Sequence, residues 1–437
     1  MLIIYIILLV LLMLIISFLP IKTTILVATL LLPFQQAFTL NIAGTVRIAD
    51  ILYVSALIGV FIKILLKKLN YNIELNIGAI YFIYLALGSC IVGYLLRNDI
   101  QNGLATLGDY NESRLLVNVL TPVIALLIFI IGNYAGKQNK NYFQRILHFW
   151  AYGVIMLSIY VIIQFVIVNI TGNWIKMPGE VMNYNTSFAY GIRRPWGFSI
   201  EPGALGNFLF YSWLMILIFL EKSTLRKITI VISFFAVLLS FSSTAIFAIF
   251  VLLILLILTN KKGLKTRYKV ILVLMISVAI IFVLANSTAY DATIGKITTD
   301  NYSKLDRQAN TEILTRMFTA HPIFGIGAGN YGALRNLFSQ GTLIPVKDYY
   351  DMPNVFYYGM FAEQGVVGVV LFLLFVKRLW SSAKLLNKSP IIWLIPIAVL
   401  IFSASTVTFD YMVFGFGMII GQAQYLQKQV DDEDKVT

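Results

Sequence analysis

Long apolar runs recur along the whole sequence and largely determine what it can fold into. Each run has roughly 17 to 25 residues, the length of α-helix needed to cross a hydrocarbon core of about 30 Å. Hydrophobic residues make up 59% of the 437 positions and charged residues only 12%, whereas soluble domains are about 25% charged. The alternation over about ten residues that marks a transmembrane β-barrel is missing from the sequence. The sequence therefore predicts an all-α polytopic membrane protein.

We predict about 12–14 transmembrane helices from these runs. The number is a range because the two runs on either side of Ser240–Thr244 together hold barely enough residues for two crossings. The spans are expected at about 2–19, 22–40, 48–66, 77–96, 115–134, 147–170, 204–220, 226–240, 243–259, 269–285, 355–376, 390–407 and 410–426.

Lysine and arginine are distributed unevenly between the intervals that separate the runs. Most of the 33 fall in one set of alternate intervals, such as 63–68, 137–145 and 222–227. The positive-inside rule places these intervals in the cytoplasm, so the two large loops, 171–203 and 286–353, should face outward. The remaining parts are an N-terminal transmembrane bundle (1–170), central transmembrane helices (204–285), C-terminal transmembrane helices (354–426) and a cytoplasmic tail (427–437).

The net charge of +13 does not indicate nucleic-acid binding, because the basic residues lie in short clusters between apolar runs. Cys90 is the only cysteine, so a disulfide framework or a cysteine-based metal site is excluded. The two histidines, His148 and His321, lie in different hydrophilic intervals, and His148 is at the start of a span. We therefore predict neither a metal nor a cofactor.

The longest hydrophilic interval contains the stretch KLDRQANTEILTRMFTAHPIFGIGAGNYG, from Lys304 to Gly332. Four of its residues, at spacings of five, four and five, can lie near one face of a single helix. These are Arg307, Glu312, Arg316 and His321. Apolar residues from Ile313 to Phe318 fit one face of an amphipathic helix lying on the membrane surface.

Histidine is the usual acid or base near neutral pH, which makes His321 a candidate to orient or deprotonate an attacking hydroxyl. A structural role for His321 is the alternative. Pro322 would end the helix, and the glycine-rich run after it can bring N–H groups close to phosphate oxygens. The candidate substrate contacts in this region are Arg316, Gly325, Gly327, Asn330 and Gly332. The G-x-G-x-x-G spacing is not set in a βαβ unit, which excludes a dinucleotide-binding fold.

A second polar cluster, YGIRRPWGFSIEPGALGNF, lies in the first large loop. Arg193 and Arg194 offer a fork geometry suited to phosphate, and Trp196 is suited to stacking on a sugar. Glu201 precedes Pro202, a residue favoured in the first turn of a helix, so its carboxylate should lie beside a helix N-terminus. Helix capping with an Arg–Glu contact is the alternative to a catalytic role for Glu201.

Ionisable residues are scarce inside the predicted spans, which disfavours a proton- or ion-coupled transporter. The deepest one is Glu363, in the span expected at 355–376. An unpaired carboxylate would be costly there. We therefore expect Glu363 to contact an arginine or a polar cavity.

Three stretches of the sequence resemble a single family. Arg307 with HPIFGIGAGNYG, which begins at His321, resembles the large outer loop of the O-antigen polymerase and O-antigen ligase superfamily (Wzy- and WaaL-type). His321 and Gly332 have ten residues between them, which matches the histidine-x10-glycine pattern of that loop. RRPWGFSIEPGALGNFL resembles the other large outer loop, whose arginine is functional, although neither Arg193 nor Arg194 meets its arginine-x10-glycine spacing. NVFYYGMFAEQGVVGVVLF is similar to the span after the main loop.

The resemblance implies a metal-independent, inverting glycosyltransferase of the GT-C type in the bacterial cytoplasmic membrane. Its substrates would be glycans carried by undecaprenyl pyrophosphate at the outer face. Arg307 with Arg193 or Arg194 would stabilise the charge of the pyrophosphate leaving group. Membrane lipid, a flippase and a chain-length regulator are the expected partners.

A polymerase that joins lipid-linked repeat units of O-antigen or capsule fits these features best. A ligase that moves the finished polymer to another acceptor is the nearest alternative, since only the acceptor separates the two. A lipid-linked oligosaccharide flippase or transporter would require a charged cavity within the spans. A scaffold without activity would leave the arginines unexplained.

Overall fold

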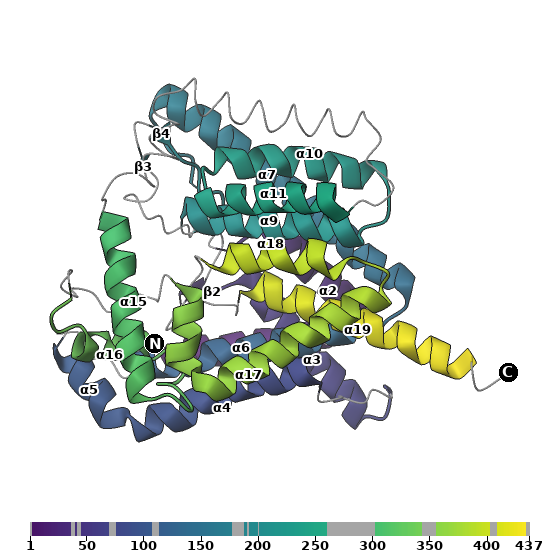
Figure 1. The fold of residues 1–437 in the computed structure, drawn as a ribbon. Coiled ribbons are helices and arrows are strands. Elements are labelled where there is room, and N and C mark those ends of the chain that lie inside the picture. The colour runs from purple at the N-terminus through teal and green to yellow at the C-terminus, as the bar shows by residue number, and fades with distance from the viewer. Residues whose placement is uncertain are drawn as a thin grey trace.

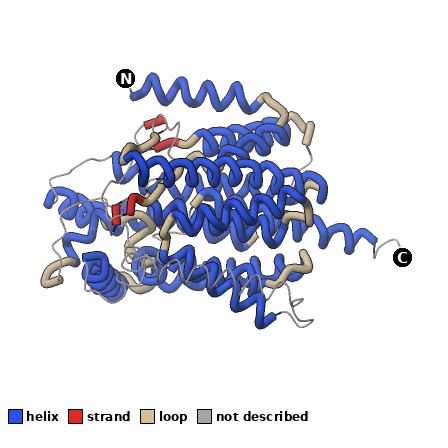
Figure 2. The backbone as a smooth tube through the Cα atoms, turned by 90° about the horizontal axis from the view of Figure 1, so that it is seen from above, coloured by secondary structure: helices blue, strands red, loops and turns tan. Residues whose placement is uncertain are grey.

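The computed structural model shows a bundle of helices that run side by side, together with two small hairpins (Figure 1). Viewed from above, α1 lies at one edge of the array (Figure 2). The structure describes residues 2–35, 40–41, 45–69, 76–106, 113–176, 188–189, 192–199, 201–259, 302–342, 355–402 and 409–433.

The helices are α1 (Leu2–Ser17), α2 (Ile21–Leu31), α3 (Ile48–Leu65), α4 (Ile77–Leu95), α5 (Arg97–Thr106), α6 (Ser113–Gly136), α7 (Lys140–Thr171), α9 (Pro202–Phe219), α10 (Thr224–Leu239), α11 (Ser243–Thr259), α15 (Tyr302–Ala320), α16 (Tyr331–Phe338), α17 (Phe356–Leu385), α18 (Pro390–Phe402) and α19 (Asp410–Glu433). The strands form two antiparallel pairs, β1 (Leu40–Asn41) with β2 (Thr45–Val46), and β3 (Phe188–Ala189) with β4 (Ile192–Arg193).

Within the described residues, five helices are long and apolar enough to cross a membrane, namely α3, α4, α7, α9 and α17. Four shorter apolar segments accompany them: Ile21–Leu31, Leu120–Gly136, Ser243–Thr259 and Pro390–Ile401. These helices confirm the predicted all-α polytopic membrane protein. The total of twelve to fourteen crossings stays a prediction, and the span expected at 269–285 lies outside the described residues.

Two of the bundle helices, α6 and α19, pack with their backbones nearly in contact. A Cβ atom at Gly136 would lie 2.1 Å from the carbonyl oxygen of Met418, and one at Gly421 would lie 2.2 Å from that of Asn133. Each helix has two such glycines four residues apart, which are Gly132 and Gly136 on α6 and Gly417 and Gly421 on α19. This small-xxx-small spacing lets membrane helices approach closely. Sequence patterns alone did not predict that these two helices pair.

One end of the bundle carries α5, α15, α16 and the first segment of α17, and we call it the loop end. There α15 and the first segment of α17 run across the ends of the bundle helices (Figure 1). These elements share a second hydrophobic core, separate from that of the bundle. Its buried members are Ile100, Ile313, Leu314, Met317, Ile326, Tyr331, Ala333, Leu334 and Ala362. The apolar face predicted on α15 thus packs against protein on α16 and α17.

An ion pair joins the starts of α3 and α19. Arg47, the residue before α3, donates a hydrogen bond to Asp410, the first residue of α19. Both side chains are largely shielded from solvent, with 27% and 13% of their surface exposed. Because the two residues are 363 positions apart, this contact fixes two distant parts of the chain to each other.

Candidate active site

The loop that begins at His321 is the centre of the candidate site. Arg307 and Arg316 both lie on α15, as their spacing predicted, and His321 is the first residue after this helix. The N–H of His321 donates to the carbonyl of Met317 at 3.0 Å, and its own carbonyl accepts from the N–H of Gly325 at 3.0 Å. The half-buried imidazole therefore sits on a backbone that is fixed on both sides. The side chain of Arg307 lies outside the described part of the structure.

The helix that follows the main loop is broken. In α17, Gly365 has a φ of 62° and a ψ of −170°, which interrupts the helix. In an unbroken helix the N–H groups of residues 366–367 would donate to the carbonyls of Ala362 and Glu363. They donate instead to the carbonyls of residues 322–323, at 2.9 and 3.2 Å.

The loop after His321 uses the two carbonyls that this break leaves open. The N–H groups of Ile326 and Gly327 donate to them, each at 2.9 Å. Two segments, 322–327 and 362–367, therefore exchange the hydrogen bonds that each would make within a helical turn of its own. We call this paired structure the clasp. It holds the histidine loop against α17 through main-chain bonds alone.

The clasp requires a glycine in each segment. Gly325 has a φ of 71°, and both it and Gly365 thus adopt the left-handed conformation that glycine tolerates best. A Cβ at Gly325 would lie 2.4 Å from the main-chain carbonyl carbon of Glu363, and one at Gly365 would lie 2.3 Å from the carbonyl oxygen of Ile323. The histidine loop can therefore approach α17 this closely only with glycine at position 325. The N–H of Gly325 is already bonded to the carbonyl of His321, so it is not directed at a phosphate.

Glu363 has a partner other than the predicted arginine or polar cavity. Its carboxylate accepts a hydrogen bond from the N–H of Gly329 at 3.1 Å. Within the described part of the chain, no basic side chain forms an ion pair with Glu363. The glycine-rich run was expected to offer its N–H groups to phosphate, and the structure shows that the N–H of Gly329 is used by this carboxylate.

Two other predicted contacts in the run are also engaged within the fold. The N–H of Gly327 belongs to the clasp, and the buried side chain of Asn330 donates to the carbonyl of Ile326 at 2.9 Å. Gly332 lies in the first turn of α16. The loop therefore brings His321, Gly325, Gly327, Asn330 and Gly332 together and is bound to α17 by the N–H groups of its glycine-rich run.

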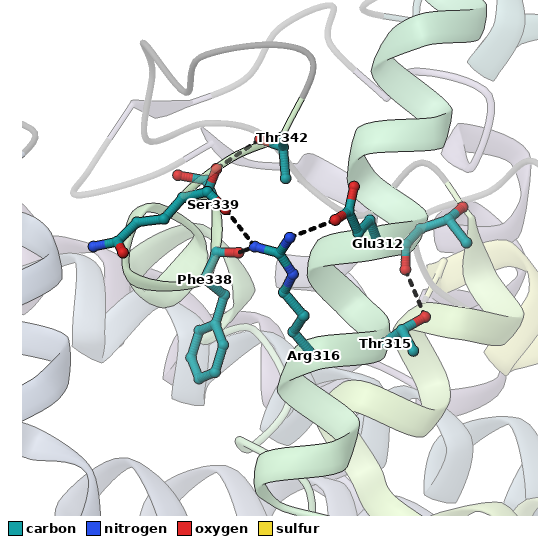
Figure 3. A network of polar contacts seen from close by, with 8 residues as sticks. Glu312, Thr315, Arg316, Phe338, Ser339 and Thr342 are labelled. Atoms are coloured by element: carbon teal, nitrogen blue, oxygen red, sulfur yellow. Dashed lines mark hydrogen bonds and ion pairs between the residues drawn. The ribbon is translucent and has the colours of Figure 1, made fainter.

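Arg316 points from α15 toward the end of α16 (Figure 3). Its guanidinium donates to the carbonyls of Phe338 at 3.0 Å and Gln340 at 2.6 Å, and it forms an ion pair with Glu312. A guanidinium has five N–H donors, and here the two contacts of Nη1 connect α15 to the end of α16. Arg316 therefore has structural partners within the fold while 38% of its side chain is exposed, and the substrate contact predicted from the sequence stays a prediction.

The two adjacent arginines of the first large loop have different surroundings. Arg194 is buried, with 8% of its surface exposed, and donates to the carbonyls of Ser240 at 3.2 Å and Phe241 at 3.0 Å. Arg193 is only partly buried, and its Nη1 donates to the carbonyl of Gly172. Of the two, Arg193 thus keeps the more accessible guanidinium, whereas Arg194 ties the loop to the turn between α10 and α11.

Trp196 does not offer a surface for sugar stacking. Its side chain is fully buried, with its ring centroid 4.2 Å from that of Trp174. The main-chain N–H of Trp196 donates to the side chain of Gln164 at 3.1 Å. The predicted sugar platform is therefore corrected to a packing residue, because the loop folds inward onto α7.

Glu201 directly precedes α9, as predicted, but its side chain makes no capping hydrogen bond. Burial raises the pKa of the Glu201 carboxyl above its ordinary value, and the nearby Arg194 guanidinium opposes that shift. The same burial lowers the pKa of Arg194. Within the described residues, histidine, cysteine and acidic side chains form no group of three or more that could hold a metal ion.

The part of the chain that contains this loop and the clasp matches a known family. Residues 228–373, about a third of the chain, fit the family model described as O-antigen ligase (Wzy_C). This stretch of the chain is similar to O-antigen ligases. The match is consistent with the superfamily that the sequence resembles. A search of curated proteins gave no match.

The matched region covers most of α10, all of α11, α15 and α16, and the first part of α17, so it includes His321 and both segments of the clasp. The family implies an enzyme that transfers glycosyl groups and acts on lipid-linked polysaccharide. Together with the apolar helices, it makes this chain a multi-pass membrane enzyme of polysaccharide synthesis.

Proposed function

We propose that the protein is a polymerase that joins undecaprenyl-pyrophosphate-linked oligosaccharide repeat units into a cell-surface polysaccharide at the outer face of the cytoplasmic membrane. The observation that carries the proposal is the position of His321. It lies at the loop end, inside the matched region, and its backbone is fixed between α15 and the clasp. Such a loop can keep an acid–base group at a constant position relative to the membrane helices.

The proposed reaction is an inverting displacement at the anomeric carbon of the donor sugar. An acceptor hydroxyl oxygen forms a new bond to the anomeric carbon. At the same time the bond between this carbon and the pyrophosphate oxygen breaks. The imidazole of His321 takes the hydroxyl proton, and the pyrophosphate leaves with the bonding electron pair. Arginine stabilises the charge that develops on the leaving group, and Arg307 and the accessible Arg193 are our candidates.

A ligase is the second candidate, because the matched family model is described as O-antigen ligase. A ligase would use the same bond-breaking step, with the glycan of the lipid carrier as donor and a different acceptor molecule. The residues around His321 serve both reactions equally. The acceptor must therefore be identified by experiment.

The test is a glycan gel of cells in which this gene is deleted and then complemented. The complementing genes encode the wild type, Arg307→Ala, His321→Ala or the control His148→Ala, with membrane expression of each confirmed. His148 is the only other histidine, and its Nδ1 lies 2.6 Å from the carbonyl of Gln144 on α7. We expect only the wild type and the His148 variant to restore a polymer ladder.

The deletion strain separates the two candidate functions. Single repeat units on the normal acceptor, without longer chains, identify a polymerase. Full-length polymer that accumulates on the lipid carrier identifies a ligase. Full restoration of the ladder by His321→Ala would contradict the proposed role of the imidazole.

A further inference from the structure

Glu363 binds the histidine loop in two ways, once through its main chain and once through its side chain. Its carbonyl accepts from the N–H of Gly327 at 2.9 Å, and its carboxylate accepts from the N–H of Gly329 at 3.1 Å. Gly327 and Gly329 both have a φ of 84°, so the loop turns sharply around this one residue. The side chain of Glu363 thus contacts the part of the loop that lies between the clasp and α16.

The start of α16 lacks a capping side chain of its own. Asn330 occupies the N-cap position but makes no capping hydrogen bond, since its amide group donates back to the carbonyl of Ile326. A helix N-terminus exposes unpaired N–H groups and favours a negative charge nearby. The carboxyl group of Glu363, bound to the N–H of Gly329 one residue before the N-cap, supplies an acceptor there from α17.

We propose that Glu363 is a positioning residue for the glycosyl transfer. The carboxylate anchors the second half of the loop to α17, as the clasp anchors the first half, and so keeps His321 and the start of α16 at a fixed separation. This inference rests on the proposed function, because it concerns the same loop. Glu363 itself need not touch the substrate.

The rest of the loop end can remain folded without this side chain. The four hydrogen bonds of the clasp are made by the main chain, and the second hydrophobic core contains no atom of Glu363. Removal of the carboxylate should therefore loosen residues 327–331 while α15 and α17 keep their structure. A residue that served stability alone would instead affect all of these elements together.

Three substitutions separate the charge of Glu363 from its reach. Glu363→Gln keeps an acceptor oxygen but removes the charge, Glu363→Asp keeps the charge on a side chain about 1.5 Å shorter, and Glu363→Ala removes both. The matched control is Glu221→Gln, which removes the same charge from the exposed ion pair with Lys140.

The first measurement is hydrogen exchange of the purified full-length protein, followed by mass spectrometry of peptides from residues 321–338. It requires no substrate. For Glu363→Ala we expect exchange in this region to rise about tenfold, the effect of losing one hydrogen bond, with peptides of α15 unchanged. Glu363→Asp should behave in the same way, whereas Glu363→Gln should lie closer to the wild type.

The second measurement is steady-state transfer of the lipid-linked glycan extracted from the deletion strain. We expect kcat of Glu363→Ala to fall about ten- to a hundredfold, as small displacements of a catalytic group do, while KM changes less than about twofold. Glu221→Gln should match the wild type in both measurements.

Two results would overturn the proposal. Unchanged exchange in residues 321–338 would show that the carboxylate does not hold the loop. A loosened loop with wild-type kcat would show that the position of the loop does not matter for transfer. If the wild type itself fails to transfer any lipid-linked glycan, the proposed function fails, and the exchange measurement still decides whether Glu363 anchors the loop.

Discussion

Replacing Gly365 with alanine tests the clasp most directly. At Gly365, with a φ of 62° and a ψ of −170°, alanine costs about 1–3 kcal/mol because this backbone region is essentially restricted to glycine. In addition, its Cβ would lie 2.3 Å from the carbonyl oxygen of Ile323, whereas ordinary contacts begin at 3.4 Å. The two segments must therefore separate by about 1 Å, which lengthens hydrogen bonds of 2.9–3.2 Å beyond the range in which they count as bonds. Four bonds at about 1 kcal/mol each bring the expected loss of stability to about 5–7 kcal/mol, as long as the separated segments do not form helical turns of their own.

Gly341→Ala is the matched control for this substitution. Gly341 has a φ of 76°, and a Cβ there meets nothing within 4 Å. It should lose only the conformational term of about 1–2 kcal/mol and should still support a polymer ladder. Gly365→Ala should lose the ladder as well as stability, because the histidine loop would separate from α17.

The assay is equilibrium unfolding of both purified variants and the wild type in the same detergent, with the glycan gel as the functional readout. The difference between the two variants is the decisive quantity, since both carry a conformational cost at a positive φ but only Gly365→Ala also brings a Cβ against the opposite segment. Equal losses of stability would refute the close approach of the two segments. A stable Gly325→Ala variant would do the same, because its Cβ would clash with the opposite segment in a similar way.

Three further predictions concern other parts of the molecule and are tested by the same unfolding measurement. Arg47→Ala should cost about 3 kcal/mol, since it leaves the shielded carboxylate of Asp410 without its partner, and adding Asp410→Asn should recover part of that loss. Gly136→Leu should separate α6 from α19 and lower stability by about 3 kcal/mol, because even a single Cβ would lie 2.1 Å from the carbonyl oxygen of Met418. The contribution of Glu201 to stability should fall as the pH rises from 4.5 toward neutrality. The raised pKa of Glu201 means that the folded state binds more protons than the unfolded state in this range. In Glu201→Gln this part of the pH dependence should be absent.

The bundle helices were largely predictable because apolar length is a local property of the sequence. The run expected at 243–259 coincides with α11, and α3 and α4 end within one residue of their predicted bounds. By contrast, α5 was not predicted, since its residues are mostly polar and it is held by packing against α16. The helix that carries Arg316 followed from spacing, but the partners of Arg316 did not.

The location of the candidate site could be predicted from the sequence. The hydrogen-bonding and packing partners of its residues mostly could not. The span expected at 355–376 was predicted as continuous, yet α17 breaks at Gly365 because its hydrogen-bonding partner lies about 40 residues earlier in the chain. Local hydrophobicity contains no information about such a partner. The matching glycine positions in PIFGIG and AEQGVV were a signal that could have revealed it. Trp196 was misjudged for a similar reason, since its burial depends on Trp174 in another part of the loop.

The clasp does not change the number of main-chain hydrogen bonds in the protein, compared with two ordinary helical turns in the same segments. If segments 322–327 and 362–367 each formed an ordinary helical turn, they would make four bonds, which is also the number they make with each other. The choice between a broken and a continuous α17 is therefore not made by the number of backbone hydrogen bonds. It is made by the torsion angles of the two glycines and by the packing of the atoms around them. Single substitutions near Gly325 and Gly365 can thus shift this helix between two conformations of equal bonding.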